Sequence, residues 1–159
     1  MPRFSLPLDI IITLHLVSLQ QTLCDQQQKW FHIYAKRCVY ITDAAPNPPL
    51  KLRCQSGDVD LRMRTITEGQ NFSWSFRPGL FLTTRFYCHF YWCSQEKIVD
   101  VYSKKIDKFC KDNHREFHCY YRVQREGIYF SNDNFSYKKV AEWGPSKKTT
   151  NATGHKYQY

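Results

Sequence analysis

Short runs in which apolar and polar residues alternate follow one another through most of the chain. In Leu50–Gln55, two leucines and a cysteine alternate with basic and amide side chains. The same alternation recurs in Phe72–Phe76, Phe86–Trp92 and Cys119–Val123. A period of two is typical of β-strands with one buried face. The pattern therefore predicts several short strands whose inner faces share one core.

Turn signals separate these runs. Asp43–Pro49 contains three prolines, and Ser56–Asp60, Arg77–Gly79 and Arg125–Gly127 have turn composition. After the N-terminal segment we expect no long helix before residue 100, and residues 103–118 are predicted to form a loop or one short helix. Short strands at this spacing indicate an all-β antiparallel sandwich or barrel.

The N-terminus has the pattern of a signal peptide. Met1 and Arg3 precede the apolar stretch Ile10–Leu19, which is too short to span a bilayer. Thr22 and Cys24 are small residues at the positions that a signal peptidase reads, which predicts a signal peptide over residues 1–24. A polar lead-in over residues 25–35, a domain over 36–143 and a flexible basic tail over 144–159 would follow. The predicted location is secreted and extracellular.

The cysteines fit that compartment. Removal of the signal peptide with Cys24 leaves an even set, which in a secreted domain indicates a disulfide framework. The six are Cys38, Cys54, Cys88, Cys93, Cys110 and Cys119. Three sequons predict N-glycosylation at Asn71, Asn134 and Asn151. Asn71 lies in a predicted strand, where its face could be buried.

The chain is strongly basic. It has 23 Lys and Arg against 14 Asp and Glu, a formal net charge of +9. Such a charge favours acidic partners: cell-wall polyanions, an anionic membrane, nucleic acid or an acidic receptor loop. Aromatic residues make up 16% of the chain, so a dense core is available, and this composition argues against general disorder.

Metal and catalytic sites are expected to be absent. Zinc could be imagined at Cys88, His89 and Cys93, or at Cys110, His114, His118 and Cys119. An oxidising compartment consumes thiols, so we predict neither a metal nor a cofactor. Acid–base cleavage of RNA would need two histidines around one phosphate, and no such motif is visible, so we predict no enzyme. Asp58 and Asp60 are assigned to turn hydrogen bonds rather than calcium.

Outward-facing aromatic residues could form a platform for nucleic acid or glycans. They are Tyr87, Tyr91 and Tyr120, with Arg85 and Arg122 among them. We favour the alternative that the tail or a glycan half-covers them.

Several segments, in order, resemble the plant self-incompatibility S-protein homologue family over about residues 36–143. They are Leu50–Leu61, Gly69–Phe76, Thr83–Trp92, Asp100–Tyr102, Cys110, Cys119 and Trp143. The resemblance implies a compact, secreted antiparallel β-sandwich with an immunoglobulin-like two-sheet architecture and no catalytic site. The founding role of the family is recognition of self pollen by the pistil.

The resemblance also implies the disulfides Cys54–Cys119 and Cys88–Cys110. Two features depart from the family pattern. Arg62 stands where the family usually has glycine after the acidic turn, and Cys38 and Cys93 lie outside the usual four cysteines. Strand parity places both extra cysteines on an outer surface, which suggests an added bridge between them.

Together these features predict a monomeric extracellular ligand that displays loops to an unidentified cell-surface receptor on another cell, with retention in acidic cell-wall polysaccharide as a further interaction. Nucleic-acid binding and stable membrane insertion are not expected. The candidate contact loops are Asp43–Pro49, Ser56–Asp60, Arg77–Leu82 and Ser94–Lys97. The alternatives are a cationic defence protein acting on microbial membranes and, third, a secreted hydrolase or ribonuclease.

Overall fold

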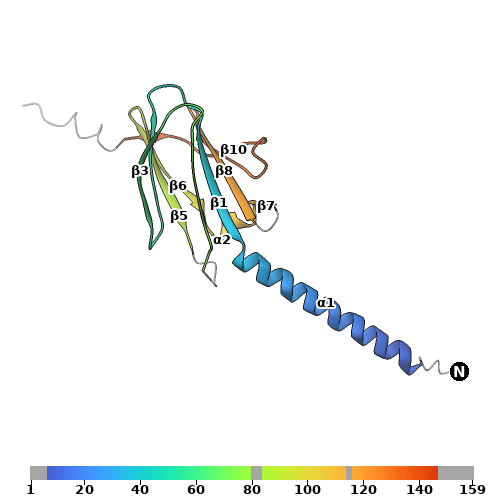
Figure 1. Ribbon diagram of the computed structural model, residues 1–159. Helices are drawn as coiled ribbons and strands as arrows, with labels where there is room; N and C mark the ends of the chain where they lie inside the picture. The colour runs from blue at the N-terminus through green and yellow to red at the C-terminus, as the bar shows by residue number, and fades with distance from the viewer. Residues whose placement is uncertain (1–6, 80–83, 114–115, 147–159) are drawn as a thin grey trace, which may run out of the picture.

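A computed structural model describes residues 7–79, 84–113 and 116–146 as a long helix joined to two packed β-sheets (Figure 1). The helix α1 spans Leu8–Tyr34. A single turn of helix, α2, spans Lys104–Asp107 and follows the second sheet's longest strand. The all-β architecture predicted from the alternation is confirmed, and of the sandwich and the barrel it is the two-sheet sandwich implied by the resemblance.

The strands divide between the sheets as follows. Sheet 1 has the order β10-β9-β8-β1-β4, with β7 also paired to β8. Its strands are β1 Lys36–Asp43, β4 Asn71–Phe76, β7 Lys111–Asn113, β8 Glu116–Gln124, β9 Gly127–Ser131 and β10 Lys138–Ala141. Sheet 2 has the order β11-β6-β5-β2-β3. Its strands are β2 Leu50–Gln55, β3 Asp60–Ile66, β5 Phe86–Trp92, β6 Gln95–Tyr102 and β11 Gly144–Pro145.

The core lies between the sheets, where the alternation placed it. Phe86, Cys88, Phe90 and Trp92 of β5 are buried, and the residues between them are half-buried. Strand β8 repeats this pattern from the opposite sheet. Burying one large apolar side chain contributes about 1.5–3 kcal/mol, so these facing rows hold the two sheets together.

One strand pair departs from the antiparallel pattern. β1 and β8 run parallel, with Lys36 opposite Glu116 and Asp43 opposite Val123. The other paired strands in the described residues are antiparallel. The parallel pair joins the first strand to a strand 80 positions later in the chain, in the interior of sheet 1.

The two terminal segments differ from the sequence prediction. Residues 25–34, predicted as a polar lead-in without a helix, continue α1, because no glycine or proline interrupts Leu8–Tyr34. Gly144 and Pro145, predicted as the start of a flexible tail, form β11 against Glu96 and Gln95. Residues 1–6 of the predicted signal peptide and 147–159 of the predicted tail lie outside the described residues.

The disulfide pairing taken from the resemblance is wrong in this structure. Cys54 is bonded to Cys88, and Cys110 to Cys119. Cys54 and Cys88 are direct cross-strand partners on β2 and β5, with their Cα atoms 4.0 Å apart. β7 folds back along β8, which brings Cys110 within 4.8 Å of Cys119 between Cα atoms.

The bridge suggested between Cys38 and Cys93 is not formed either. Cys38 lies near the start of β1. Cys93 follows Trp92, whose indole nitrogen donates to the carbonyls of Pro46 and Pro48 beyond the other end of β1. The two thiols therefore lie at opposite ends of the sandwich. Parity placed Cys38 correctly on the outer side of β1, but its neighbours bury it, whereas Cys93 is exposed.

Candidate functional site

A groove of about 1070 Å³ opens along one side of the sandwich. Its walls are β6 of sheet 2 and the β9–β10 hairpin of sheet 1, and Ile106 and Phe109 from the α2 region contribute to its lining. Neither sheet contains this groove alone, because it forms where their edges face each other.

The groove combines a buried aromatic residue with exposed aliphatic and aromatic side chains. The Tyr121 ring is buried and packs 5.3 Å from the Phe130 ring, measured between centroids. Burial and the charge of Asp100 both raise the pKa of Tyr121, so its hydroxyl stays protonated. Ile98, Phe109 and Val140 are 56%, 56% and 49% exposed. Exposed apolar side chains gathered in one hollow are typical of an interaction site.

Basic side chains surround this apolar surface. Arg85, Lys97, Lys138 and Lys139 all contribute to the lining, whereas Asp100 is the one acidic residue among the described residues that line it. The Asp100 carboxylate accepts hydrogen bonds from Arg85 Nη2 at 2.7 Å and Nε at 3.0 Å. The net charge around the groove is therefore positive.

The turn between β9 and β10 is held rigidly beside the groove. Asp133 Oδ1 accepts hydrogen bonds from Ser131 Oγ at 2.7 Å, from Ser136 N at 2.8 Å and from Phe135 N at 2.9 Å. These donors hold the pKa of Asp133 well below its usual range. The guanidinium of Arg122 lies 4.1 Å from the Tyr137 ring centroid. A backbone fixed in this way presents Ser136 to the groove in one conformation.

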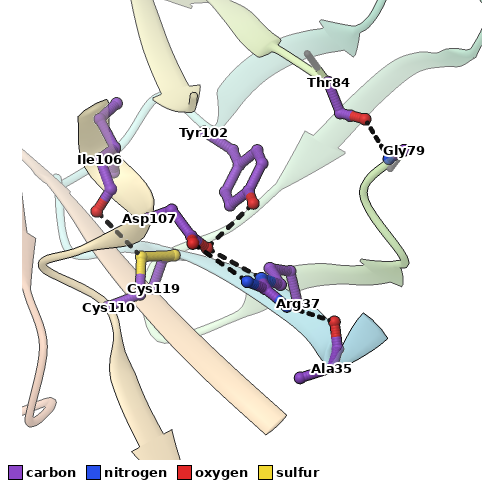
Figure 2. A network of polar contacts seen from close by, with 9 residues as sticks. All are labelled: Ala35, Arg37, Gly79, Thr84, Tyr102, Ile106, Asp107, Cys110 and Cys119. Carbon is purple, nitrogen blue, oxygen red and sulfur yellow. Dashed lines mark hydrogen bonds and ion pairs between the residues drawn. A yellow bond between two sulfur atoms is a disulfide. The ribbon is translucent and has the colours of Figure 1, made fainter. Parts of the chain in front are cut away.

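A buried ion pair supports the sandwich at the end where α1 enters (Figure 2). Arg37 Nε and Nη2 donate to the two oxygens of Asp107 at 2.8 and 3.0 Å, and the Tyr102 hydroxyl donates to Oδ1 at 2.9 Å. Figure 2 shows that this network lies beside the Cys110–Cys119 disulfide. Burial opposes the charge of Arg37, but its bonds to Asp107 outweigh burial and raise the pKa of the guanidinium. The network connects β1, β6 and α2 and leaves no charge open to a ligand.

The two described histidines that were considered for catalysis lie on opposite outer faces of the sandwich. His89 projects from the outer face of sheet 2, where Nε2 lies 3.1 Å from Glu96 Oε2. His118 lies on the outer face of sheet 1. His114 is outside the described residues. Because the core separates His89 from His118, these two cannot act on one phosphate.

The outward aromatic residues are likewise divided between two surfaces. Tyr87 and Tyr91 lie with His89 on sheet 2, whereas Tyr120 stacks on Tyr40 of sheet 1 with 5.0 Å between ring centroids. They do not form the single platform considered from the sequence. Arg85 belongs to the groove, and Arg122 packs on Tyr137.

In the acidic turn, Asp60 makes the predicted turn hydrogen bond, whereas for Asp58 such a bond stays a prediction. Asp60 Oδ1 accepts a hydrogen bond from the backbone N of Arg62 at 2.9 Å, and Oδ2 from Arg53 Nη2 at 2.6 Å. The Arg53 bond and then the Arg62 backbone bond lower the pKa of Asp60 to about 2. Arg62 itself has φ 66°, so an arginine here adopts the left-handed conformation that favours glycine.

The predicted contact loops lie at both ends of the sandwich. Asp43–Pro49 and Ser94 lie at the end opposite α1, whereas Ser56–Asp60 lies at the α1 end. Arg77–Gly79 also lies there, and residues 80–82 are outside the described residues. Among the described residues of the four loops, only Lys97 contributes to the groove.

Two of the predicted sequons can be placed. Asn71 begins β4 and is exposed, and Asn134 is exposed in the turn beside the groove. Asn151 is outside the described residues. Glycosylation of all three stays a prediction.

Sequence reasoning missed most of the groove. Lys138, Lys139 and Val140 form a short edge strand whose burial pattern has no alternation, so no local signal marks them. Phe109 and Ile98 read as ordinary apolar residues. An exposed apolar residue becomes informative only when its neighbours in space are known.

None of the described helices combines the length and apolarity needed to cross a membrane.

Comparison with known proteins places this fold and its sequence in one family. The family described as "Plant self-incompatibility protein S1" matches residues 38–143. S-protein homolog 29 of Arabidopsis thaliana is 35% identical over 91 residues, covering 57% of this chain and 62% of that protein. Self-incompatibility protein S1 of Papaver rhoeas is 34% identical over 79 residues, covering 49% of this chain and 55% of that protein. The chain covers 62%, 66% and 62% of three Arabidopsis relatives, S-protein homologs 29, 5 and 19.

A solved structure agrees with the fold. It belongs to a self-incompatibility protein homologue, from a family described as small, highly stable, secreted plant proteins. The TM-score is 0.52 at 15% identity, covering 69% of this chain and 96% of that one, which supports the shared fold alone. The match over residues 38–143, at these identities and with this fold, establishes that the chain belongs to the plant self-incompatibility protein S1 family.

Proposed function

We propose that this protein is a secreted recognition ligand whose groove binds an acidic segment, containing apolar side chains, of a receptor on another cell. The observation that carries the proposal is the combination of exposed Ile98, Phe109 and Val140 with four surrounding basic residues. Apolar side chains would supply affinity, and the positive charge would select an acidic partner and speed encounter.

The family supports the extracellular part of the proposal. The solved relative comes from a family described as secreted, and a relative from Papaver rhoeas is named for self-incompatibility. The fold offers a rigid scaffold, with the groove held between two hydrogen-bonded sheet edges. A preorganised groove loses little conformational entropy on binding, which suits recognition.

The geometry favours binding over hydrolysis. His89 and His118 face away from each other, and the groove is lined by basic, apolar and neutral polar side chains with a single carboxylate among its described residues. That carboxylate, on Asp100, is held by Arg85. General acid–base catalysis needs two such groups around one bond.

Charge reversal in the groove tests the proposal. Lys138→Glu with Lys139→Glu lowers the net charge from +9 to +5, since each exchange removes one positive charge and adds one negative charge. Lys51→Glu with Arg125→Glu changes the charge equally at exposed sites outside the groove lining. We expect the groove variant to lose saturable binding to pollen, root or leaf cells, measured with labelled protein at physiological salt, and the control variant to keep it.

Equal loss of binding in both variants would contradict the proposal, because binding would then depend on the net charge and not on the groove. The protein would be a nonspecific polycation, whose long-range charge effects are weakened by screening at this ionic strength. Cross-linking through a photoreactive group placed at Ile98 then identifies the bound receptor. Capture of cell-wall polysaccharide alone would also overturn the receptor assignment.

A further inference from the structure

We propose that Cys38, Glu116 and His118 form a binding site for Zn²⁺ on the outer face of sheet 1. This inference is independent of the groove, which opens along a different side of the sandwich. From the sequence no metal is expected, and the two cysteine sets considered there are excluded because Cys88, Cys110 and Cys119 are in disulfides. The set found here includes a thiol that is in no disulfide.

The parallel pairing of β1 and β8 assembles the three side chains. Cys38 lies directly opposite His118 in the ladder, and Glu116 precedes His118 by two residues on the same face of β8. One ligand atom from each residue lies within 4.8 Å of the other two. Three residues separated by up to 80 positions in the chain thus converge through ordinary strand geometry.

The separations suit a tetrahedral ion. Cys38 Sγ lies 3.7 Å from Glu116 Oε2, and His118 Nε2 lies 3.8 Å from the same oxygen. Zinc bonds of about 2.0–2.3 Å place neighbouring ligand atoms of a tetrahedron about 3.3–3.8 Å apart. Small side-chain movements would bring all three onto one ion.

The hydrogen bonding of His118 points to a ligand. Its side chain is 12% exposed, and its Nδ1 is buried without a hydrogen-bond partner in the described part of the chain. Its Nε2 is 3.8 Å from the carboxylate, beyond hydrogen-bond reach. A metal bond to Nε2 would give this mostly buried imidazole a partner on the side that faces the carboxylate, and Nδ1 would then carry the ring proton.

Neighbouring residues fix the ligands. Lys36 Nζ donates to Glu116 Oε1 at 3.0 Å, which leaves Oε2 directed at the thiol and the imidazole. The Tyr40 ring stacks on His118 with 5.7 Å between centroids and an interplanar angle of 12°. Such outer contacts orient metal ligands and are costly to remove.

The donor set selects the class of metal. A thiolate with an imidazole and a carboxylate suits Zn²⁺ and is unsuited to Mg²⁺ or Ca²⁺, which prefer oxygen ligands. The thiolate and carboxylate charges would balance the two charges of the ion, and a fourth position would be filled by water. Binding releases the thiol proton to solvent, so no oxidant or reductant is required.

Zinc titration of the untagged, disulfide-intact full chain tests the site. After removal of metal with a chelator, isothermal titration calorimetry with Zn²⁺ should give one ion per chain. Co²⁺ should give a visible spectrum with a thiolate-to-metal charge-transfer band. Cys38→Ser and His118→Gln should each weaken Zn²⁺ binding by at least about 100-fold, beyond the range for loss of an outer-shell partner.

Matched controls come from the opposite sheet. Cys93→Ser removes the exposed thiol, and His89→Gln removes the imidazole paired with Glu96. Both should bind Zn²⁺ as the unchanged chain does, and far-UV circular dichroism should show the same β-sheet fold in all four variants. If Cys38→Ser misfolds, the Zn²⁺ affinity of His118→Gln and the Co²⁺ spectrum of the unchanged chain still test the site. Binding unaffected by both ligand variants, or a Cys38 thiol found in a disulfide in the purified protein, would overturn the proposal.

Discussion

At the scale of single residues, Arg62 combines a retained turn with a costly backbone conformation. Its φ of 66° is left-handed, and it sits at an irregularity in the β2–β3 pairing between the partners of Arg53 and Gln55. A left-handed residue other than glycine costs about 1–2 kcal/mol. The resemblance identified the departure from glycine, but only the structure reveals that the backbone of Arg62 adopts the left-handed conformation that favours glycine.

Arg62→Gly should therefore stabilise the protein by about 1 kcal/mol in chemical denaturation. Arg64→Gly, in the same strand but at ordinary φ, serves as the control and should destabilise by about 0.5–1 kcal/mol. If both variants lost the same stability, the strain assigned to Arg62 would be wrong.

Arg62 costs stability, whereas Asp107 is a buried carboxylate that stabilises its neighbours. Asp107→Asn removes the negative charge facing the buried Arg37 guanidinium and should cost about 3–5 kcal/mol. The double variant Arg37→Met with Asp107→Leu should lose less, because no buried charge remains without its partner. Urea unfolding of the single and double variants measures the coupling. The exposed Asp112→Asn exchange should stay within about 0.5 kcal/mol, and an Asp107 effect that small would refute the assignment.

At the scale of elements, the two disulfides belong to different substructures. Cys54–Cys88 ties β2 to β5 across 34 positions, and Cys110–Cys119 closes a segment of 9. In the chain-entropy model these closures stabilise by about 4 and about 3 kcal/mol.

Replacing both cysteines of a pair with alanine should therefore cost more for Cys54–Cys88 than for Cys110–Cys119, by about 1 kcal/mol. The single exchange Cys93→Ala should have little effect, because that thiol is exposed and in no disulfide. Non-reducing peptide mapping checks the pairing itself. A peptide linking Cys54 to Cys119 would restore the pairing implied by the resemblance and contradict this structure.

Strand positions were predictable at this scale, and strand partners were not. The alternation located β2, β4, β5 and β8, since each carries an inward row of large apolar side chains. It did not locate β7 or β10, which are short and mostly exposed. Where the local pattern is this weak, whether a segment forms a strand depends on the strands that lie beside it in the fold.

At the scale of the whole molecule, α1 projects away from the sandwich (Figure 1). Its described apolar side chains between Leu8 and Leu23 are 39–74% exposed. Such a helix gains little from packing, which fits the predicted removal of residues 1–24.

Mass spectrometry of the protein secreted by plant cells should find Asp25 at its N-terminus. A chain that begins at Asp25 should unfold with the same free energy as the full chain, within about 0.5 kcal/mol. A chain that begins at Val39 provides the contrast. It lacks the buried Arg37 and should not fold stably. Equal instability of the two truncations would show that the part of α1 before Asp25 stabilises the sandwich.

The sequence by itself determined the fold class, the inward rows of the long strands and the basic charge. These follow from local composition and from an alternation with a period of two, and both can be recognised from residues that are close together in the sequence. Tertiary structure alone decided that Cys54 pairs with Cys88, that Cys38 faces His118 and that Ile98 meets Val140 in one groove. The physical reason is that alternation fixes the face of a side chain but not the strand beside it, and that strand can lie 80 residues away, as β8 does from β1.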